Sequence, residues 1–534
     1  MSRRIAVQLL GSALLAAALI PSASWEAVLG AEPGALEWGP ALFRALLAFH
    51  GAALVWAGRR PWDLWLRGPG FERSEWLALG GLVAAALALR LYRLNTQLWV
   101  DEVFMLLDFG RAPLERILTM FPSQNQHMLY SLSARACVGL FGESPWALRL
   151  PAALLGAATT VPLYGLGRKL WDRRIALAAA GLLTVSYHHI WFSQNARGYS
   201  ALLLFAVWAT WLWLEAVDRN EPALWIGYGA TLALGLGFHL TMLFVAAAHG
   251  LVWLAGLARG AGIPVRGPLL AWLFGATATL QIHALALPEF FSSALHEASM
   301  DSEWTEPLWV LAEMVRNLKI GWSGSAVLAV GGVVLAAGWL DLARRRWDAA
   351  WIFGLAPALG GGLTLAMGHN LWPRFFFFAM GFALLLALGG AFALPRRLFG
   401  ERAGARWGTA VSALLIAASA ATLPRVYALP KQDFEGARAF AESGSAAVIA
   451  PGIAGRIYHG YYAPAWLAVE TPEELAAARS RAPGAWLVYT LAPEIRAFQP
   501  AVWDTIERDY EPVRRFPGTL GEGEIVVCRP KENR

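Results

Sequence analysis

Two adjacent carboxylates, Asp101 and Glu102, stand out in the sequence because of where they lie. They follow the apolar residues 98–100 and come shortly after a long apolar segment that ends near Arg93, which puts them at a membrane surface rather than in a solvated loop tip. A carboxylate held where lipid headgroups meet water can deprotonate a hydroxyl group, and paired acids shift each other's pKa values. The alternative is a surface ion pair without a part in chemistry.

Other polar side chains lie at the ends of apolar segments. Charged groups near the hydrocarbon core cost free energy, so those that persist there suggest a function. Sorted by the predicted side of the membrane, they share the outer face with the acid pair. The inner face has almost only arginine clusters, with a few acids that can pair with them. We therefore expect any chemistry at the outer surface, with contributions from His127, Gln194, Arg197, Tyr199, His239, Lys319 and Arg374.

The elements that position these residues are predicted to be membrane-spanning helices. Of the 534 residues, 57% are hydrophobic and 15% are charged, whereas soluble proteins have about 45–50% apolar and 25% charged residues. Apolar stretches that are long enough, or nearly so, to cross the hydrocarbon core recur thirteen times. They lie near 5–20, 41–57, 75–92, 146–166, 175–192, 200–216, 223–238, 240–257, 268–287, 325–341, 349–366, 374–393 and 408–425.

The arginines predict the orientation of these spans, since Lys and Arg are enriched in cytoplasmic loops. Their distribution puts the N-terminus in the cytoplasm, and the odd number of spans puts the C-terminus outside. The transmembrane domain is then 1–425, with external loops 93–145 and 288–324. A second interpretation of the first span is a cleavable secretory signal, because Arg3-Arg4 precedes it and Ser22-Ala23-Ser24 follows it. The later loops keep their sides in either case.

Residues 426–534 are predicted to form a small external α/β domain. Helical patterns at 434–442, 473–481 and 493–510 alternate with short apolar runs at 446–450, 485–491 and 524–528, which are typical of strands. In the first external loop, 103–120 has the pattern of a helix that lies on the bilayer. The fold class is therefore an all-α polytopic membrane domain followed by a small α/β soluble domain.

Several function classes are disfavoured by the sequence. The net charge of +6 comes from short basic clusters between apolar runs, which fits membrane orientation rather than nucleic-acid binding. Cys137 and Cys528 lie far apart and suggest neither a disulfide framework nor a thiolate metal site. The sequence contains no P-loop and no glycine-rich dinucleotide fingerprint, so it gives no support to a soluble nucleotide-sugar site.

Five motifs before the C-terminal domain resemble, in order, those of the GT-C membrane glycosyltransferases. The similarity is to the family 39-like group, which includes bacterial relatives of protein O-mannosyltransferases and of the lipid A aminoarabinose transferase. The motifs are Leu98–Glu102, like that family's W-x-D-E; Asn125–Leu132; Gly142–Pro151, like G-x-S-x-x-A-L-R-L-P; Ser193–Tyr199, like S-x-x-A-R-x-Y; and Pro373–Phe375, like R-Y at the start of a late span.

This resemblance implies a GT-C fold of about thirteen transmembrane helices and an inverting transfer of a hexose or pentose. The sugar would pass from a polyprenyl-phosphate-linked donor to a protein, lipid or glycan acceptor in the cell envelope, at the outer side of the cytoplasmic (inner) membrane. Asp101 is the implied general base, with Glu102 as positioning partner or second carboxylate. The implied donor-phosphate ligands are Arg197, Arg374 and Lys319, and the implied substrate pocket consists of His127, Gln194, Tyr199 and His239.

Three points stay open from the sequence alone. The family often has H-P-P-L-Y and R-Y where this chain has 127–130 and Arg374-Phe375, so the resemblance does not imply the acceptor. Some relatives use a divalent metal, and the acids and histidines of 289–303 could bind one or simply form a solvated loop. The alternative function is a polytopic lipid or sugar transporter or flippase, although no internal repeat is evident.

Overall fold

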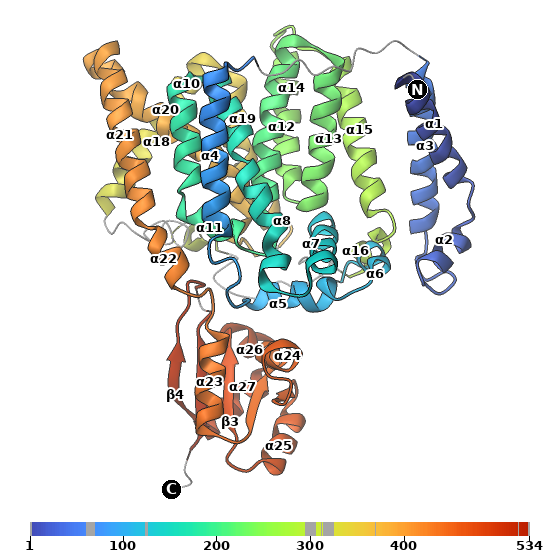
Figure 1. The fold of residues 1–534 in the computed structure, drawn as a ribbon, viewed down its shortest axis with the longest axis vertical. Coiled ribbons are helices and arrows are strands. Elements are labelled where there is room, and N and C mark those ends of the chain that lie inside the picture. Colours follow the sequence, from blue (N-terminus) through green and yellow to red (C-terminus); the bar gives the residue numbers. More distant parts are fainter. Residues whose placement is uncertain are drawn as a thin grey trace.

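The computed structural model describes residues 3–59, 70–122, 126–293, 306–310, 312, 325–368, 370–521 and 523–531. These residues form a broad bundle of helices with a small α/β unit at one end (Figure 1). The short helices of the first long loop lie at that same end, between the bundle and the α/β unit. The loop that carries Asp101 is therefore covered on two sides by protein.

Each predicted span coincides with one helix or with two consecutive helices. They are α1 (Arg3–Ala18), α3 (Gly39–Gly58), α4 (Arg73–Leu91), α8 (Pro145–Ala158) with α9 (Thr160–Leu170), α10 (Arg173–Thr184) with α11 (Tyr187–Ser193), α12 (Tyr199–Arg219), α13 (Pro222–Phe238), α14 (Met242–Ala258), α15 (Arg266–His283), α18 (Ser325–Arg345), α19 (Trp347–Ala366), η4 (Pro373–Ala379) with α20 (Met380–Phe399), and α21 (Glu401–Ala421).

The chain is a multi-pass membrane protein. Among the residues that the structure describes, seven helices are long and apolar enough to cross a membrane, or up to nine if each bent pair is one span. The total of thirteen spans stays a prediction, since several of the remaining helices are shorter. The two bent pairs are α1 with α2 (Ser22–Val28), at 96°, and α10 with α11, at 57°.

Helix α12 is the centre of the bundle. Its apolar side chains leave no polar face, and a helix of this kind is buried on all sides; 78% of its apolar window lies inside the protein. Helix α21 is somewhat less apolar, but only 11% of the apolar window that includes it is buried, and it lies at the edge of the bundle in Figure 1. Its free face is therefore suited to lipid.

The predicted first external loop, 93–145, forms a series of short helices. These are α5 (Val100–Met105), the π-helix η1 (Leu106–Gly110), α6 (Leu114–Thr119) and, after residues 120–127, α7 (Met128–Phe141); α16 (Leu287–Ser292) lies at the same end. The predicted surface helix at 103–120 is thus divided in three. Of its predicted apolar positions Ile117 is buried, whereas Leu114 is exposed.

The C-terminal unit contains a five-stranded sheet in the order β2-β1-β3-β5-β4. Strands β2 (Leu467–Val469), β1 (Val448–Pro451) and β3 (Trp486–Thr490) are parallel, whereas β5 (Ile525–Pro530) and β4 (Tyr510–Phe516) pair antiparallel. The helical elements are α22 (Leu423–Ala428), α23 (Phe434–Gly444), α24 (Gly452–Ile457), the π-helix η5 (Tyr458–Tyr462), α25 (Pro472–Arg481), α26 (Ala492–Phe498) and α27 (Pro500–Asp509).

The predicted helix at 493–510 is wrong as a single element. It consists of α26 and α27, separated at Gln499, whose backbone (φ −137°, ψ 53°) is not helical. A proline disfavours helical geometry at the residue before it, so Pro500 ends the first helix and begins the second.

The α/β unit shares one continuous apolar core with the first external loop. Trp99 and Val103 from the loop belong to the same buried cluster as Phe434, Tyr458 and Val488 from the C-terminal unit. Hydrogen bonds across this contact add specificity, since a buried polar group needs a partner. The C-terminal unit thus fixes the loop that carries the two predicted carboxylates.

Candidate active site

Asp101 contacts two arginines that are far away in the sequence. Its Oδ2 atom lies 3.7 Å from Nη1 of Arg197 and 3.7 Å from Nη1 of Arg374. Asp101 as a residue is only 8% exposed, and its Oδ2 accepts no hydrogen bond from any residue within the described ranges. The fold therefore brings a predicted base and two of the three predicted phosphate ligands together at the end of the bundle next to the α/β unit.

The turn before α12 places Arg197 by close backbone packing. Gly198 follows Arg197, and a Cβ atom at Gly198 would lie 2.1 Å from the carbonyl oxygen of Phe238 at the end of α13. Only glycine fits such a contact without a shift of the backbone. Arg374 is fixed differently, by its place in the first turn of η4 and by stacking at 4.9 Å over the ring of Trp372.

Glu102 differs from its neighbour because both of its oxygens are fully engaged. Arg149 binds it in a bidentate manner, with Nε 2.7 Å from Oε1 and Nη2 2.5 Å from Oε2. The backbone N–H groups of Ala196 and Trp99 donate to the same oxygens, at 2.8 Å and 3.3 Å. This arrangement fits the positioning role predicted for Glu102 and leaves Asp101 as the carboxylate that can act on a substrate.

The residues around Glu102 favour its ionised form. Burial alone would raise the pKa of Glu102, but the adjacent Arg149 and Lys431 outweigh burial and keep that pKa below its ordinary value. Arg149 is itself held by the carbonyl oxygens of Leu94, Thr96 and Gln97, at 2.8–2.9 Å. Glu102 and Arg149 thus tie the start of α5 to α8.

Three residues of the predicted substrate pocket form an aromatic cluster. The ring centroids of His127 and His239 are 4.5 Å apart, and Tyr199 lies 4.9 Å from His239 and 5.8 Å from His127. The N–H of Thr241 donates to Nδ1 of His239 at 3.3 Å. In a neutral imidazole the other nitrogen then carries the proton, so Nε2 of His239 is a hydrogen-bond donor. Within the described residues, Nε2 of neither histidine has a partner.

Two predicted site residues stand apart from this cluster. The side-chain amide of Gln194 donates to the carbonyl oxygens of Arg90 and Tyr92, at 2.9 Å and 2.7 Å, and so binds the end of α4. Lys319, the third predicted phosphate ligand, lies outside the described residues.

Most of the residues that could bind the predicted metal lie outside the described residues. Of the acids and histidines at 289–303, the structure describes Glu289 alone, and its carboxylate accepts a hydrogen bond from the N–H of Phe121 at 2.5 Å. In the described part of the chain, no group of three or more His, Cys, Asp or Glu side chains is arranged to hold an ion. Metal dependence stays a prediction.

The C-terminal unit supplies residues that the sequence reasoning missed. Nζ of Lys431 lies 3.8 Å from Oε1 of Glu102 and donates to the carbonyl of Gln194 at 2.5 Å. Burial lowers the pKa of Lys431 to about 7, although Glu102 opposes this shift. Glu494, in the first turn of α26, lies within electrostatic reach of Asp101 and Arg374. Nothing in the local pattern around either residue indicated such a contact.

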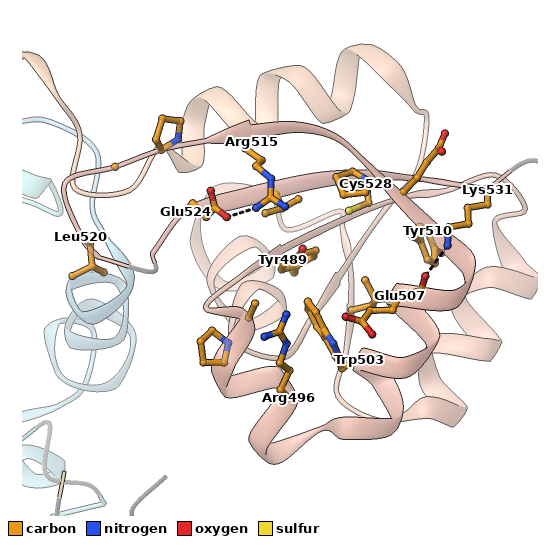
Figure 2. A pocket seen from close by; sticks show the side chains of 18 residues that line it. Tyr489, Arg496, Trp503, Glu507, Tyr510, Arg515, Leu520, Glu524, Cys528 and Lys531 are labelled. Carbon is orange, nitrogen blue, oxygen red and sulfur yellow. Dashed lines mark hydrogen bonds and ion pairs between the residues drawn. The ribbon is translucent and has the colours of Figure 1, made fainter. Parts of the chain in front are cut away.

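A separate cleft of about 700 Å³ lies within the α/β unit (Figure 2). Its wall includes Trp503, over which Arg496 stacks at 4.5 Å, and an ion pair between Arg515 and Glu524. None of the predicted site residues lines this cleft. The chemistry predicted from the sequence therefore belongs to the interface around Asp101.

Comparisons with known proteins agree with this architecture. Residues 127–286 match the family described as dolichyl-phosphate-mannose-protein mannosyltransferase. This segment contains Arg197, Tyr199 and His239, but not Asp101 or Arg374. No curated protein sequence matches the chain at a significant level.

The chain is also similar to solved structures of membrane enzymes. ArnT from Cupriavidus metallidurans bound to undecaprenyl phosphate is 11% identical, with a TM-score of 0.52 over 86% of this chain and 98% of that one. Its apo form is 13% identical, with a TM-score of 0.51 over 85% and 98%. The Archaeoglobus fulgidus oligosaccharyltransferase tethered with an acceptor peptide is 12% identical, with a TM-score of 0.48 over 86% and 76%.

The fold is therefore that of the membrane glycosyltransferases. More specifically, the chain has the GT-C fold, and its residues 127–286 match the family described as dolichyl-phosphate-mannose-protein mannosyltransferase. The resemblance noted in the sequence motifs is thus confirmed at the level of fold.

Proposed function

We propose that this protein is a glycosyltransferase that moves a sugar from a polyprenyl-phosphate-linked donor to an acceptor at the outer side of the cytoplasmic membrane. The observation that carries this proposal is Asp101 between Arg197 and Arg374, with 3.7 Å to each. Such a transfer needs two cations that can bind the phosphate and, beside them, one carboxylate that is free to act as base. The match to the mannosyltransferase family and the similarity to ArnT, whose solved structure is bound to undecaprenyl phosphate, support the donor class.

In the proposed reaction, Asp101 takes the proton of the acceptor hydroxyl while the hydroxyl oxygen attacks the anomeric carbon. The bond between that carbon and the phosphate oxygen breaks on the opposite face, so the configuration inverts. The electron pair of the broken bond stays on the phosphate oxygen. A base in this position contributes about 10²–10⁴-fold in rate.

Arg197 and Arg374 would stabilise the departing polyprenyl phosphate. Each guanidinium has five N–H donors, so contact with Asp101 leaves donors for phosphate oxygens. Arginine also keeps its proton and can hold two oxygens at once. Lys319 remains a proposed third cation.

The aromatic cluster would hold the transferred sugar. His239 offers an N–H donor at Nε2, and the rings of His127 and Tyr199 provide flat faces for the apolar side of a sugar ring. We leave the acceptor as a class, an envelope protein, lipid or glycan, and the sugar as a hexose or pentose.

The test uses the full chain in proteoliposomes with undecaprenyl phosphate that carries a radiolabelled hexose or pentose, and membrane extract as the acceptor source. We expect transfer of label by the wild type and a loss of about 10²-fold or more in Asp101→Asn. Asp108→Asn is the matched control, because Asp108 lies on the same loop but pairs with Arg456 of the C-terminal unit. Transfer by Asp101→Asn at the wild-type rate would remove Asp101 as base; movement of donor across the bilayer without transfer would favour the transporter.

A further inference from the structure

Arg90 is a fully buried cation in the last turn of helix α4. Its Nη1 atom donates to the carbonyl oxygens of Ala86 and Thr184, at 2.8 Å and 3.3 Å. Its Nη2 atom donates to the carbonyl oxygen of Leu183 at 3.2 Å and to Nδ1 of His189 at 2.5 Å. None of these partners is a carboxylate. Charged side chains in membrane helices are costly and rare, so the guanidinium is kept here for the backbone groups and the imidazole that it binds.

Two of these carbonyl groups lie at a break in a membrane span. Helix α10 ends at Thr184 and α11 begins at Tyr187, and the two helices are bent by 57°. The last carbonyls of a helix have no N–H donor within it, and the hydrocarbon core has no water to replace that donor. A cation at a helix C-terminus is also favoured by the helix dipole. Arg90 therefore stabilises the bent geometry of α10 and α11.

The other bent pair in the described part of the chain has an arginine in a similar place. Arg44 of α3 donates from Nε to the carbonyl oxygen of Ala18, the last residue of α1, at 3.0 Å. It donates from Nη1 to Oγ of Ser22, the first residue of α2, at 3.3 Å. Helices α1, α2 and α3 lie together at one edge of the molecule, away from α11 (Figure 1). The two breaks are thus bridged in the same way, but only the one at α11 leads to the candidate active site.

Helix α11 runs directly into the turn that carries Arg197. Arg90 contacts both ends of this helix. Its guanidinium binds His189 in the first turn, and its backbone carbonyl accepts the side-chain amide of Gln194, directly after α11, at 2.9 Å. Arg197 follows three residues after Gln194. The direction of α11, and with it the point from which Arg197 extends, therefore depends on Arg90.

We propose that Arg90 is a positioning residue of the donor-phosphate site and acts through Arg197. This proposal rests on the proposed function, in which Arg197 binds the donor phosphate. Arg90 is 0% exposed, so it does not contact the donor itself. Without its guanidinium, the carbonyls at the end of α10 lose their donors and the angle between α10 and α11 is no longer fixed. A displacement of about 1 Å at a reacting group can cost about 10²-fold in rate.

The experiment is a double-variant cycle that measures binding of undecaprenyl phosphate to the full chain in detergent micelles. Arg90→Met should raise the dissociation constant on the order of tenfold, the effect of one weakened hydrogen bond between charged groups. In a chain that already carries Arg197→Met, the same change should alter the dissociation constant by less than about twofold, because the group through which Arg90 acts is gone.

The cycle also separates Arg197 from Arg374. The ring of His189 stacks on Phe377 of η4, with centroids 6.0 Å apart and planes at 10°, and η4 carries Arg374. In a chain with Arg374→Met, Arg90→Met should still weaken binding by about tenfold. If the effect of Arg90→Met instead disappears with Arg374→Met and persists with Arg197→Met, the proposal is overturned.

His189→Phe is the second variant, and it serves if Arg90→Met does not fold. Phenylalanine keeps a ring against Phe377 but removes the Nδ1 acceptor of Arg90. It should weaken binding of undecaprenyl phosphate in the wild-type chain and have no further effect beside Arg197→Met. Binding as tight as that of the wild type in a folded Arg90→Met and in His189→Phe overturns the proposal.

Arg44→Met is the matched control, because it removes the same kind of contact at the other bent pair. Both Arg44→Met and Arg90→Met should lower the thermal unfolding midpoint. Only Arg90→Met should weaken binding of undecaprenyl phosphate. An equal loss of binding in the two variants would reflect stability alone and would overturn the proposal.

The proposed function fails in a different way from the role of Arg90. Wild-type protein that does not bind undecaprenyl phosphate overturns the donor class, and Arg197→Met that binds as tightly as the wild type removes Arg197 as a phosphate ligand. Either result also removes the role of Arg90. Losses of binding that simply add in the chain with both Arg90→Met and Arg197→Met overturn the role of Arg90 alone.

Discussion

The buried ion pair between Arg149 and Glu102 gives a sharp prediction about stability. Replacing Arg149 with leucine leaves the Glu102 carboxylate buried with two backbone N–H donors and with Lys431 at 3.8 Å. It also leaves the carbonyls of Leu94 and the neighbouring turn without their guanidinium donor. Removing one partner of a buried pair costs about 3–5 kcal/mol, because the other charge stays desolvated.

The exposed pair on the same loop provides a matched control. Arg111 and Glu143 are 2.8 Å apart, but their side chains are 42% and 39% exposed. Exposed pairs contribute about 0–1 kcal/mol, since water and salt screen them. Arg111→Leu should therefore change the thermal unfolding midpoint far less than Arg149→Leu, although both remove an arginine–glutamate contact.

The assay is thermal unfolding of the purified full chain in detergent, with binding of undecaprenyl phosphate as a second readout. Arg149→Leu should unfold at a clearly lower temperature and lose binding, because α5 no longer holds Asp101 in place. The double variant Glu102→Gln with Arg149→Met should recover part of the lost stability, since it leaves no uncompensated charge. If Arg149→Leu unfolds within error of Arg111→Leu, the positioning role of the pair is refuted.

Three further predictions concern packing, charge and orientation. Gly198→Ala should lower unfolding temperature and sugar transfer, since its Cβ would meet the Phe238 carbonyl at 2.1 Å, whereas Gly250→Ala, with open space around it, should not. Burial lowers the pKa of Lys431 from 10.5 to about 7, so between these two pH values the unfolded chain binds one proton more than the folded chain. The unfolding temperature should therefore rise from pH 7.5 to pH 9.5, and should rise less in Lys431→Met. A membrane-impermeant maleimide should label Ser443→Cys on intact cells, but Glu401→Cys only after permeabilisation.

The membrane helices were predictable because lipid permits few alternatives. Every backbone N–H and C=O group in the hydrocarbon core needs an internal partner, so a long apolar run must be a helix. The strands of the C-terminal unit were harder to predict from the sequence. Strands β1, β3 and β5 are apolar runs and were predicted, whereas β2 has three residues and β4 carries charged residues along an exposed edge. Such an edge strand does not have the pattern of a buried one.

The predicted site residues that the fold brings together lie in local motifs. Asp101, Arg197 and Arg374 each lie in a short recognisable segment, and the fold joins them. Arg149 and Glu102 each lie in a motif, but their pairing was not visible in the sequence, because it joins two helices. Lys431 and Glu494 belong to a unit whose docking surface has no sequence signature of its own. Their place in the site follows from tertiary contacts alone.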